Sequence, residues 1–182
     1  VLVCPTGALH EKHYLSEVQE QLSSDNAIRV IQYSPLVPWA LAGELGVKYN
    51  RDFDRVLNAV LRKIGFNKVF LSGTGTDILI TELADEIARR RENSEKRNLI
   101  ISACPAWVKY CEQFYPELLP LLSTLKTPQQ ISGAIIKSAV LPGDDSQRVF
   151  TVSVTPCTAM KFEARRDSTV SYTHLTLPTK RI

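Results

Sequence analysis

The chain has no long apolar run, little cysteine and no strong excess of charge of one sign. No stretch reaches the about 18 apolar residues that a membrane-spanning helix needs, and no signal-peptide pattern opens the sequence. The net charge is +3, without the basic stripe that indicates nucleic-acid binding. We therefore expect neither a membrane nor a nucleic acid among its partners.

Cysteine is scarce, with four in 182 residues, at Cys4, Cys104, Cys111 and Cys157. Thiols this few and this widely spaced exclude the disulfide scaffold of a small secreted domain. They favour a cytoplasmic location, where thiols stay reduced, and a metal-binding or reactive-thiol role. Cys111 alone is expected to act as a small buried apolar residue.

The sequence does contain alternating helix and strand patterns. Hydrophobic residues make up 44% and charged residues 23% of the chain, which suits one globular domain with a full core. Short apolar runs predict strands over residues 27–33, 68–71, 99–102 and 148–154. Apolar periodicity and end signals predict helices over residues 10–22, 38–45, 52–64, 76–91, 105–114, 117–122 and 128–140.

This alternation predicts an α/β fold with a mostly parallel sheet flanked by helices on both faces. In such sheets ligands bind beyond the carboxyl ends of the strands. The predicted strand ends carry Ser34-Pro35, Ser72-Gly73, Cys104-Pro105 and Pro156-Cys157. Gly73-Thr74-Gly75 is interpreted as a turn, because so short a glycine pair is a weak nucleotide-binding signal.

Cys104 stands where a predicted strand ends and a predicted helix begins. The free N–H groups and the dipole of a helix start stabilise a thiolate, which is the form that binds metal. Cys157 follows the last predicted strand, at what should be the same edge of the sheet. Two thiolates could bind one cluster, but iron–sulfur clusters usually take four protein ligands.

Two long motifs around these cysteines carry a family resemblance. S-A-C-P-A-W at 102–107 resembles the first cluster-binding motif of the iron-only (FeFe) hydrogenases, T-S-C-C-P-G-W, and residues 115–130 look like its continuation. T-P-C-T-A-M-K-F-E-A-R-R at 155–166 resembles the second motif, M-P-C-T-A-K-K-F-E. C-P-T-G-A-L at 4–9 is similar to the end of a ferredoxin-type cysteine run.

The resemblance implies an H-cluster, in which a 4Fe-4S cubane is joined through a cysteine sulfur to a two-iron unit carrying CO, cyanide and a dithiolate. Cys104 and Cys157 would be two of the four cubane ligands, and Cys4 a ligand of a separate ferredoxin-type 4Fe-4S cluster. The two-iron pocket would be lined by Ser34, Pro35, Gln129 and Met160.

The resemblance also divides the chain. Residues 1–9 would end a ferredoxin-type module, and 10–167 would form the first lobe of the H-cluster domain. The family's third motif and the upstream ferredoxin cysteines are absent, so we expect a fragment at both ends. Residues 168–182 resemble translated sequencing-adapter read-through and are expected to be a non-native tail, although a genuine divergent loop or strand is the alternative.

The chain departs from the catalytic family pattern along its proton relay. Ala103 occupies the position of the relay cysteine, and Leu83 that of a relay glutamate, whereas Glu86 and Ser123 remain as possible relay members. Proton transfer needs donors within hydrogen-bond reach, and an alanine methyl is not a donor.

The pocket differs as well. Met160 replaces a lysine that hydrogen-bonds a cyanide ligand, and Thr155 replaces a methionine. With these substitutions the chain resembles the sensory branch of the family.

Three functions follow from the resemblance. The favoured one is a sensory protein with slow, reversible hydrogen oxidation at an H-cluster. The alternatives are an ordinary catalytic hydrogenase with another proton route and a non-enzymatic, hydrogenase-like iron–sulfur assembly factor. The implied partners are H2, protons, a ferredoxin-like electron carrier or the protein's own upstream clusters, and the hydrogenase maturation proteins.

Overall fold

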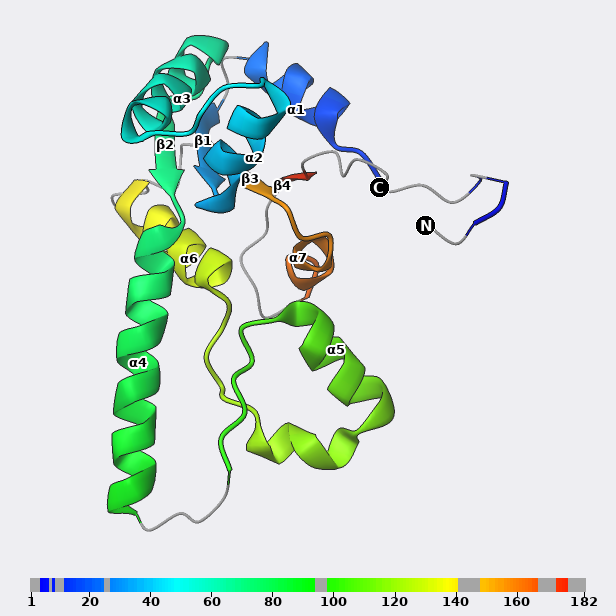
Figure 1. Cartoon of the computed structure of the whole chain (residues 1–182), viewed down its shortest axis with the longest axis vertical. Coiled ribbons are helices and arrows are strands. Elements are labelled where there is room, and N and C mark those ends of the chain that lie inside the picture. The colour runs from blue at the N-terminus through cyan, green and yellow to red at the C-terminus, as the bar shows by residue number, and fades with distance from the viewer. Residues whose placement is uncertain are drawn as a thin grey trace.

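A computed structural model describes residues 4–6, 8, 12–24, 27–93, 98–140, 148–166 and 173–176. Its centre is a parallel sheet with the strand order β2-β1-β3-β4, formed by Lys68–Leu71, Ala27–Tyr33, Arg148–Thr155 and Thr173–Thr176 (Figure 1). The predicted α/β fold with a parallel sheet is confirmed. None of the helices in the described ranges combines the length and apolarity needed to cross a bilayer.

Strand β1 is the best-buried strand. It pairs in parallel with β2 and β3 over most of its length, and Val30, Ile31, Gln32 and Tyr33 are all 2% exposed or less. Successive side chains of a strand point to opposite faces. Ile31 therefore faces one layer of helices, and Gln32 faces the other.

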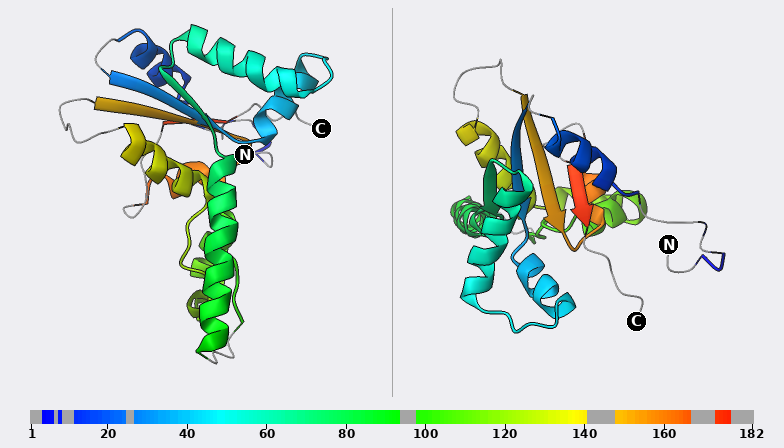
Figure 2. Two further views of the ribbon diagram at one scale, coloured as in Figure 1. Left: turned by 90° about the vertical axis from the view of Figure 1, so that its left-hand side faces the viewer. Right: turned by 90° about the horizontal axis from the view of Figure 1, so that it is seen from above.

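Helices cover both faces of the sheet (Figure 2). On one face, α1 (Leu15–Leu22) and α3 (Arg51–Ile64) close a core built from Val18, Ile31, Phe66 and Val152. On the other face lies α6 (Pro128–Val140). Helix α2 (Leu36–Glu44) follows β1 directly. The predicted starts at residues 10, 38 and 52 were wrong: residues 12–14 are not helical, α2 begins two residues earlier, and α3 begins one residue earlier behind an Asn50 cap.

Helix α4 (Gly73–Glu92) begins in the stretch that we interpreted as a turn, and that interpretation was wrong. The reason lies in its packing against α6. A Cβ added to Gly75 would lie 2.2 Å from the Pro128 carbonyl oxygen and 2.3 Å from Ser132 Oγ. The glycine therefore permits close contact between the two helices rather than a left-handed turn.

The predicted strand at 99–102 is also wrong. Ile100 makes only an isolated parallel bridge with Leu122, outside the main sheet. Helix α4 has 20 residues, a length of about 30 Å, and carries the chain away from the sheet before this segment returns (Figure 1). The apolar run thus pairs locally, and Ile101 is 54% exposed.

The returning segment leads into α5 (Pro105–Phe114), a 3₁₀ helix η1 (Pro116–Leu121) and then α6. A short helix that we did not predict, α7 (Ala159–Glu163), follows β3. Residues 173–176 form β4, in parallel register with the end of β3. The rest of the expected non-native tail, 168–172 and 177–182, lies outside the described residues, and its origin stays a prediction.

Candidate metal centre and its polar network

The carboxyl ends of β1, β2 and β3 meet at one edge of the sheet. The Ser34 N–H, after β1, donates to the Val154 carbonyl of β3 at 3.0 Å. The Ser72 N–H, after β2, donates to the Tyr33 carbonyl at 3.0 Å. Cys157 follows the end of β3. Three of the four predicted strand-end segments therefore lie at this edge, as parallel pairing requires.

Cys104 occupies the start of a helix, as expected, although the segment directly before it is not a strand of the sheet. It is the N-cap of α5, with extended backbone angles of φ −114° and ψ 109°, and Pro105 follows within the first turn. The thiol-bearing residue is exposed. A cysteine here faces the free N–H groups of α5, which suits a thiolate that binds a metal.

Helices α5 and α7 pack together and so connect the segments that follow Cys104 and Cys157. Arg166, just beyond α7, forms an ion pair with Glu112 of α5. Within the described ranges, no three cysteine, histidine or carboxylate side chains gather into a metal site. The soft thiols of Cys104 and Cys157 suit iron–sulfur chemistry, and a cubane usually takes four protein ligands.

A buried threonine organises the loop at the end of β3. Thr155 Oγ1 accepts the N–H of Cys157 at 3.2 Å and donates to Met160 Sδ at 3.1 Å. Thr155 is 1% exposed, and the other two residues are partly buried. Thr155 therefore links the candidate ligand to the candidate pocket residue, a role that the sequence did not reveal.

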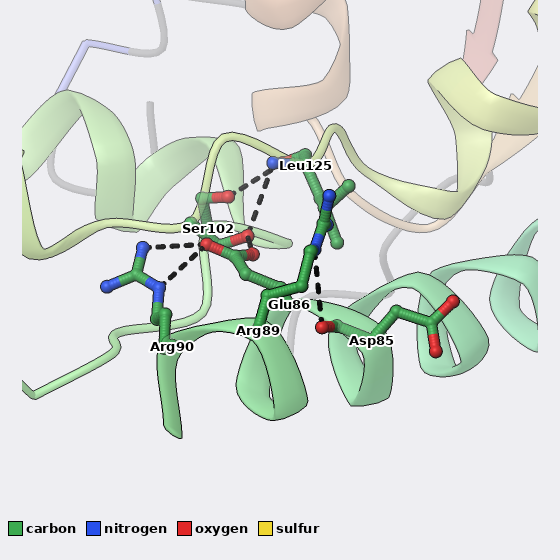
Figure 3. A network of polar contacts seen from close by, with 7 residues as sticks. Asp85, Glu86, Arg89, Arg90, Ser102 and Leu125 are labelled. Carbon is green, nitrogen blue, oxygen red and sulfur yellow. Dashed lines mark hydrogen bonds and ion pairs between the residues drawn. The ribbon is translucent and has the colours of Figure 1, made fainter. Parts of the chain in front are cut away.

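Glu86 on α4 is the centre of a polar network (Figure 3). Ser123 Oγ donates to Glu86 Oε2 at 2.7 Å, and the Arg90 guanidinium donates to Oε1 at 2.7 and 3.2 Å. The Ser123 hydrogen bond, and then Arg90, hold the pKa of Glu86 below its ordinary value against the opposing effect of burial. The two relay residues expected from the sequence are thus in contact. Arg90 was missed, although its i,i+4 spacing from Glu86 could have suggested it.

Ala103 follows a residue of this network. Ser102 Oγ donates to the Leu125 carbonyl at 2.7 Å, and the Ser123 N–H donates to the Ile100 carbonyl at 2.8 Å. These bonds hold the 100–102 segment beside Ser123. The partly buried methyl of Ala103 therefore lies one residue from the network and offers no proton.

A cavity of about 330 Å³ opens beside the same network, and its wall includes Ser102, Ser123, Lys126, Glu163 and Arg166. Glu163 is 6% exposed. Burial raises the pKa of this carboxyl above its ordinary value, partly offset by the hydrogen bond that Thr127 Oγ1 donates at 2.8 Å. The wall also includes the apolar side chains of Pro105, Val108 and Leu122, so the cavity is mixed in character, and it is large enough to hold water beside its polar groups. Glu163 was missed because it lay inside the second motif without a role of its own.

The remaining predicted residues do not gather into one cluster within the described part of the chain. Gln129, in the first turn of α6, is 4% exposed. Ser34 is partly buried, and Pro35, the N-cap of α2, is exposed. Cys4 is partly buried, and its Sγ lies 3.4 Å from Thr6 Oγ1. Their assignment to cluster binding stays a prediction.

Comparison with known proteins identifies the family. Residues 27–180 match the model of the iron only hydrogenase large subunit, C-terminal domain. The chain belongs to this family. Among curated relatives, it is 38% identical to the NADP-reducing hydrogenase subunit HndD of Solidesulfovibrio fructosivorans, over 91% of this chain and 30% of that protein.

Other relatives carry names that describe either hydrogenases or iron–sulfur assembly factors. The chain is 32% identical to the cytosolic Fe-S cluster assembly factor NAR1 of Yarrowia lipolytica, over 84% of this chain and 31% of that protein. The solved FeFe-hydrogenase HydA1 of Chlamydomonas reinhardtii superposes with a TM-score of 0.80 and 26% identity, over 91% of this chain and 45% of that one. The chain thus spans about a third of these curated relatives, which include both hydrogenases and assembly factors.

Proposed function

We propose that this chain is part of a hydrogenase-family protein that oxidises H2 reversibly to protons and electrons, slowly or as a sensor. The observation that carries the proposal is the hydrogen bond between Glu86 and Ser123, in a polar network that includes Ser102, the residue before Ala103. The network keeps a carboxylate and a hydroxyl at 2.7 Å, within the reach that proton transfer needs.

Cys104 and Cys157 would hold the cubane, with further ligands from outside this chain. Ser34, Pro35, Gln129 and Met160 would surround the two-iron unit. When bound, the H-cluster supplies the redox chemistry that splits or forms H2. The fit rests on two soft thiols, Cys104 at the N-cap of α5 and Cys157 just before α7, two helices that pack together.

The protein's own share of the reaction is proton movement. The lowered pKa of Glu86 keeps it ionised near neutral pH, and the Ser123 hydroxyl donates to it. Ser123 would therefore hand its proton to the carboxylate and be reprotonated from the cluster side, and Glu86, a weak base, would release the proton to solvent. Beyond Ser123 the next proton carrier in the family pattern is missing, since Ala103 and Leu83 have no exchangeable side-chain proton. Slow proton delivery follows, which suits a sensor better than a bulk producer of hydrogen.

Two alternatives remain. The cavity at Glu163 favours a catalytic hydrogenase with another proton route, because it borders Ser123 and its wall does not include Ala103. The similarity to NAR1 favours an assembly factor that keeps cubane ligands without the two-iron unit. A sensory protein should carry a PAS-like, kinase or phosphatase domain elsewhere in its full-length gene product, and the other two should not.

The partners follow from the same proposal. Electrons would pass to a ferredoxin-like carrier or to the protein's own 4Fe-4S clusters, one of them bound by Cys4. The maturation proteins would insert the two-iron unit. A cytoplasmic location agrees with the scarcity of cysteine and with the name of the NAR1 relative.

Restoring the relay tests the proposal in the full-length gene product. Wild type should assemble the H-cluster yet turn over hydrogen slowly, and Ala103→Cys should raise the rate by about tenfold or more, because a positioned proton donor contributes roughly 10²–10⁴-fold when a relay is complete. The gain should be partial while Leu83 interrupts the chain. Hydrogen evolution with a chemical reductant, normalised to cluster content, measures it.

The matched comparison is Leu83→Glu, alone and combined with Ala103→Cys. Residues of one relay act non-additively, so Leu83→Glu should help only when the cysteine is present. A fast wild type, or two independent gains, would contradict the slow-relay proposal and favour the catalytic alternative. A protein that binds a cubane but no two-iron unit after maturation would favour the assembly factor.

A further inference from the structure

We propose that Glu163 is a second proton carrier of this protein, which exchanges protons with Ser123 through water in the cavity that both residues line. The inference rests on the proposed function in one respect, namely that protons pass through Ser123. It supplies the group that reprotonates Ser123 from the cluster side, where Ala103 has no proton to give.

The Ser123 hydroxyl has one place left for an incoming proton. A serine hydroxyl has one proton and two lone pairs. Its proton is donated to Glu86 Oε2 at 2.7 Å, and one lone pair accepts the Leu125 N–H at 3.2 Å. Among the described residues, no other group donates to this oxygen. Because Ser123 lines the cavity, the second lone pair is the one available to a water there.

The cavity has room and polar partners for that water. Its volume is about 330 Å³, which exceeds what a single water molecule needs. A buried water needs about two to four polar partners. Side chains of this kind line one part of the wall, namely Ser102, Ser123, Thr124, Lys126, Glu163 and Arg166.

Glu163 is the only carboxyl among the described residues of this wall, and it is 6% exposed. The charged groups that act on it are Lys126, before α6, and Arg166, beyond α7, which is paired with Glu112 of α5. Burial nevertheless raises the pKa of Glu163 above its ordinary value. The hydrogen bond that Thr127 Oγ1 donates to it needs only an oxygen, so this bond does not by itself require an acid.

Helix α7 places Glu163 between the cavity and the proposed pocket. Met160 lies three residues earlier in the same helix, and side chains at this spacing are neighbours on one helix face. A neutral Glu163 would give its proton to a cavity water, and that water would give a proton to Ser123 as Ser123 protonates Glu86. Only O–H bonds break and form in these steps, and no electron moves.

The two carboxyls also explain why this route is slow. Burial raises the pKa of Glu163, whereas hydrogen bonds lower the pKa of Glu86. A proton that leaves the site must therefore pass from the weaker acid to the weaker base, which is unfavourable. Slow release of protons agrees with the slow hydrogen oxidation proposed for this protein.

The proton on Glu163 is tested without the cofactor, by infrared spectra of the cluster-free full-length gene product. Subtracting Glu163→Gln from wild type should leave the C=O band of one neutral carboxylic acid, which shifts in D2O and disappears with a midpoint above pH 4.5. Ser123→Ala should shift this band, because the bridging water loses its acceptor. Ser138→Ala, which removes an exposed hydroxyl of α6, should not shift it. A midpoint at or below pH 4.5, or a band that Ser123→Ala leaves unmoved, would overturn the proposal.

The role in turnover is tested in the matured full-length gene product. Glu163→Gln keeps an oxygen for Thr127 but cannot carry a proton, so it should slow hydrogen oxidation per loaded cluster by about tenfold or more. The CO and cyanide infrared bands should stay in place. Adding Ala103→Cys should restore the rate, because the thiol opens the other route. A purely structural role of Glu163 predicts shifted bands and no rescue by Ala103→Cys, and that result would overturn the proposal.

Filling the cavity gives an independent variant. Val108 lines the cavity, so Val108→Phe places a ring in the space for water and keeps both Glu163 and Ser123. It should slow hydrogen oxidation as Glu163→Gln does. Val56→Phe is the matched control, because Val56 on α3 is 59% exposed, and it should keep the wild-type rate. If Glu163→Gln does not fold, Val108→Phe decides in the same way.

The outcomes separate this inference from the proposed function. Loaded Glu163→Gln and Val108→Phe proteins with the wild-type rate would overturn the inference. A fast wild type that Glu163→Gln slows would support it and favour the catalytic alternative. A wild type that takes up no two-iron unit would overturn the proposed function, and the infrared band of Glu163 would still decide the inference.

Discussion

At the residue scale, one carboxyl in the polar network and one in the adjoining cavity have opposite electrostatic environments. Glu86 receives hydrogen bonds from Ser123 and Arg90, which lower its pKa below 4.5. Glu163 borders the cavity that Ser123 also lines, but burial dominates there and raises its pKa above 4.5. One side chain is therefore stabilised as an anion and the other as a neutral acid.

These shifts predict opposite pH effects on stability. The folded pKa of Glu86 lies below the unfolded value, so its contribution is present above pH 4.5 and is lost as the pH falls through the folded pKa. The folded pKa of Glu163 lies above the unfolded value, so its contribution is present below pH 4.5 and is lost as the pH rises through the folded pKa. Urea unfolding of Glu86→Gln and Glu163→Gln between about pH 3 and pH 7 measures both.

The advantage of wild type over Glu86→Gln should shrink toward acidic pH, whereas any advantage over Glu163→Gln should shrink toward neutral pH. Each variant serves as the control for the other, because both exchange a carboxyl for an amide in the same region. If the stability difference from wild type changed with pH in the same way for both variants, the hydrogen bonds of Glu86 would not offset the effect of burial on its pKa.

At the element scale, apolar periodicity and end signals in the sequence predicted well those helices and strands whose formation depends on neighbouring residues. The apolar face of 52–64 produced α3, closed by Gly65 in a positive-φ conformation. The run at 99–102 carries an equally apolar signal but has no place in the sheet. A short apolar run is ambiguous, and here the length and direction of α4 decide its partner.

The contact between α4 and α6 gives an element-scale prediction. Gly75→Ala should lower the free energy of unfolding by about 1 to 3 kcal/mol, because its Cβ would overlap the Pro128 carbonyl, a backbone atom that cannot move away cheaply. Gly43→Ala is the control, since nothing lies within 4 Å of the new Cβ in α2 and a helical alanine gains about 0.5 to 1 kcal/mol. Chemical denaturation of both variants measures the difference. Equal effects would mean that the two helices are not in tight contact.

At the scale of the whole molecule, the described ranges form a helix-covered sheet from which α4 projects, with α5 and η1 beside it (Figure 1). Strand β4 lies at the edge of the sheet, next to β3. It belongs to the segment that resembles adapter read-through, yet its backbone pairs in register with residues 152–155.

Removing residues 168–182 should change the free energy of unfolding by less than about 1 kcal/mol, the range of ordinary surface changes. The reason is that β4 is a four-residue strand at the sheet edge, and a segment of foreign origin was never selected to pack there. Thermal and urea unfolding of the two chain lengths measures the change. Removing only residues 177–182 is the control, because it leaves β4 in place. A larger loss of unfolding free energy that appears only in the longer deletion would show that β4 stabilises the fold.

The sequence by itself determined the family, the parallel sheet and the positions of Cys104 and Cys157 at chain turns. These features depend on residue identity, on apolar periodicity and on turn chemistry, which act over a few neighbouring residues. It also indicated Glu86 and Ser123 as a pair, but only through the family resemblance.

Only the tertiary structure decided which groups touch. Glu86 and Ser123 are 37 residues apart in the chain, and Gln32 and Gln129 are 97 apart. Their contacts depend on where α4 ends, on how closely Gly75 lets α6 approach, and on the register of β1 and β3. No local pattern encodes these distances, because each results from the packing of whole elements against one another.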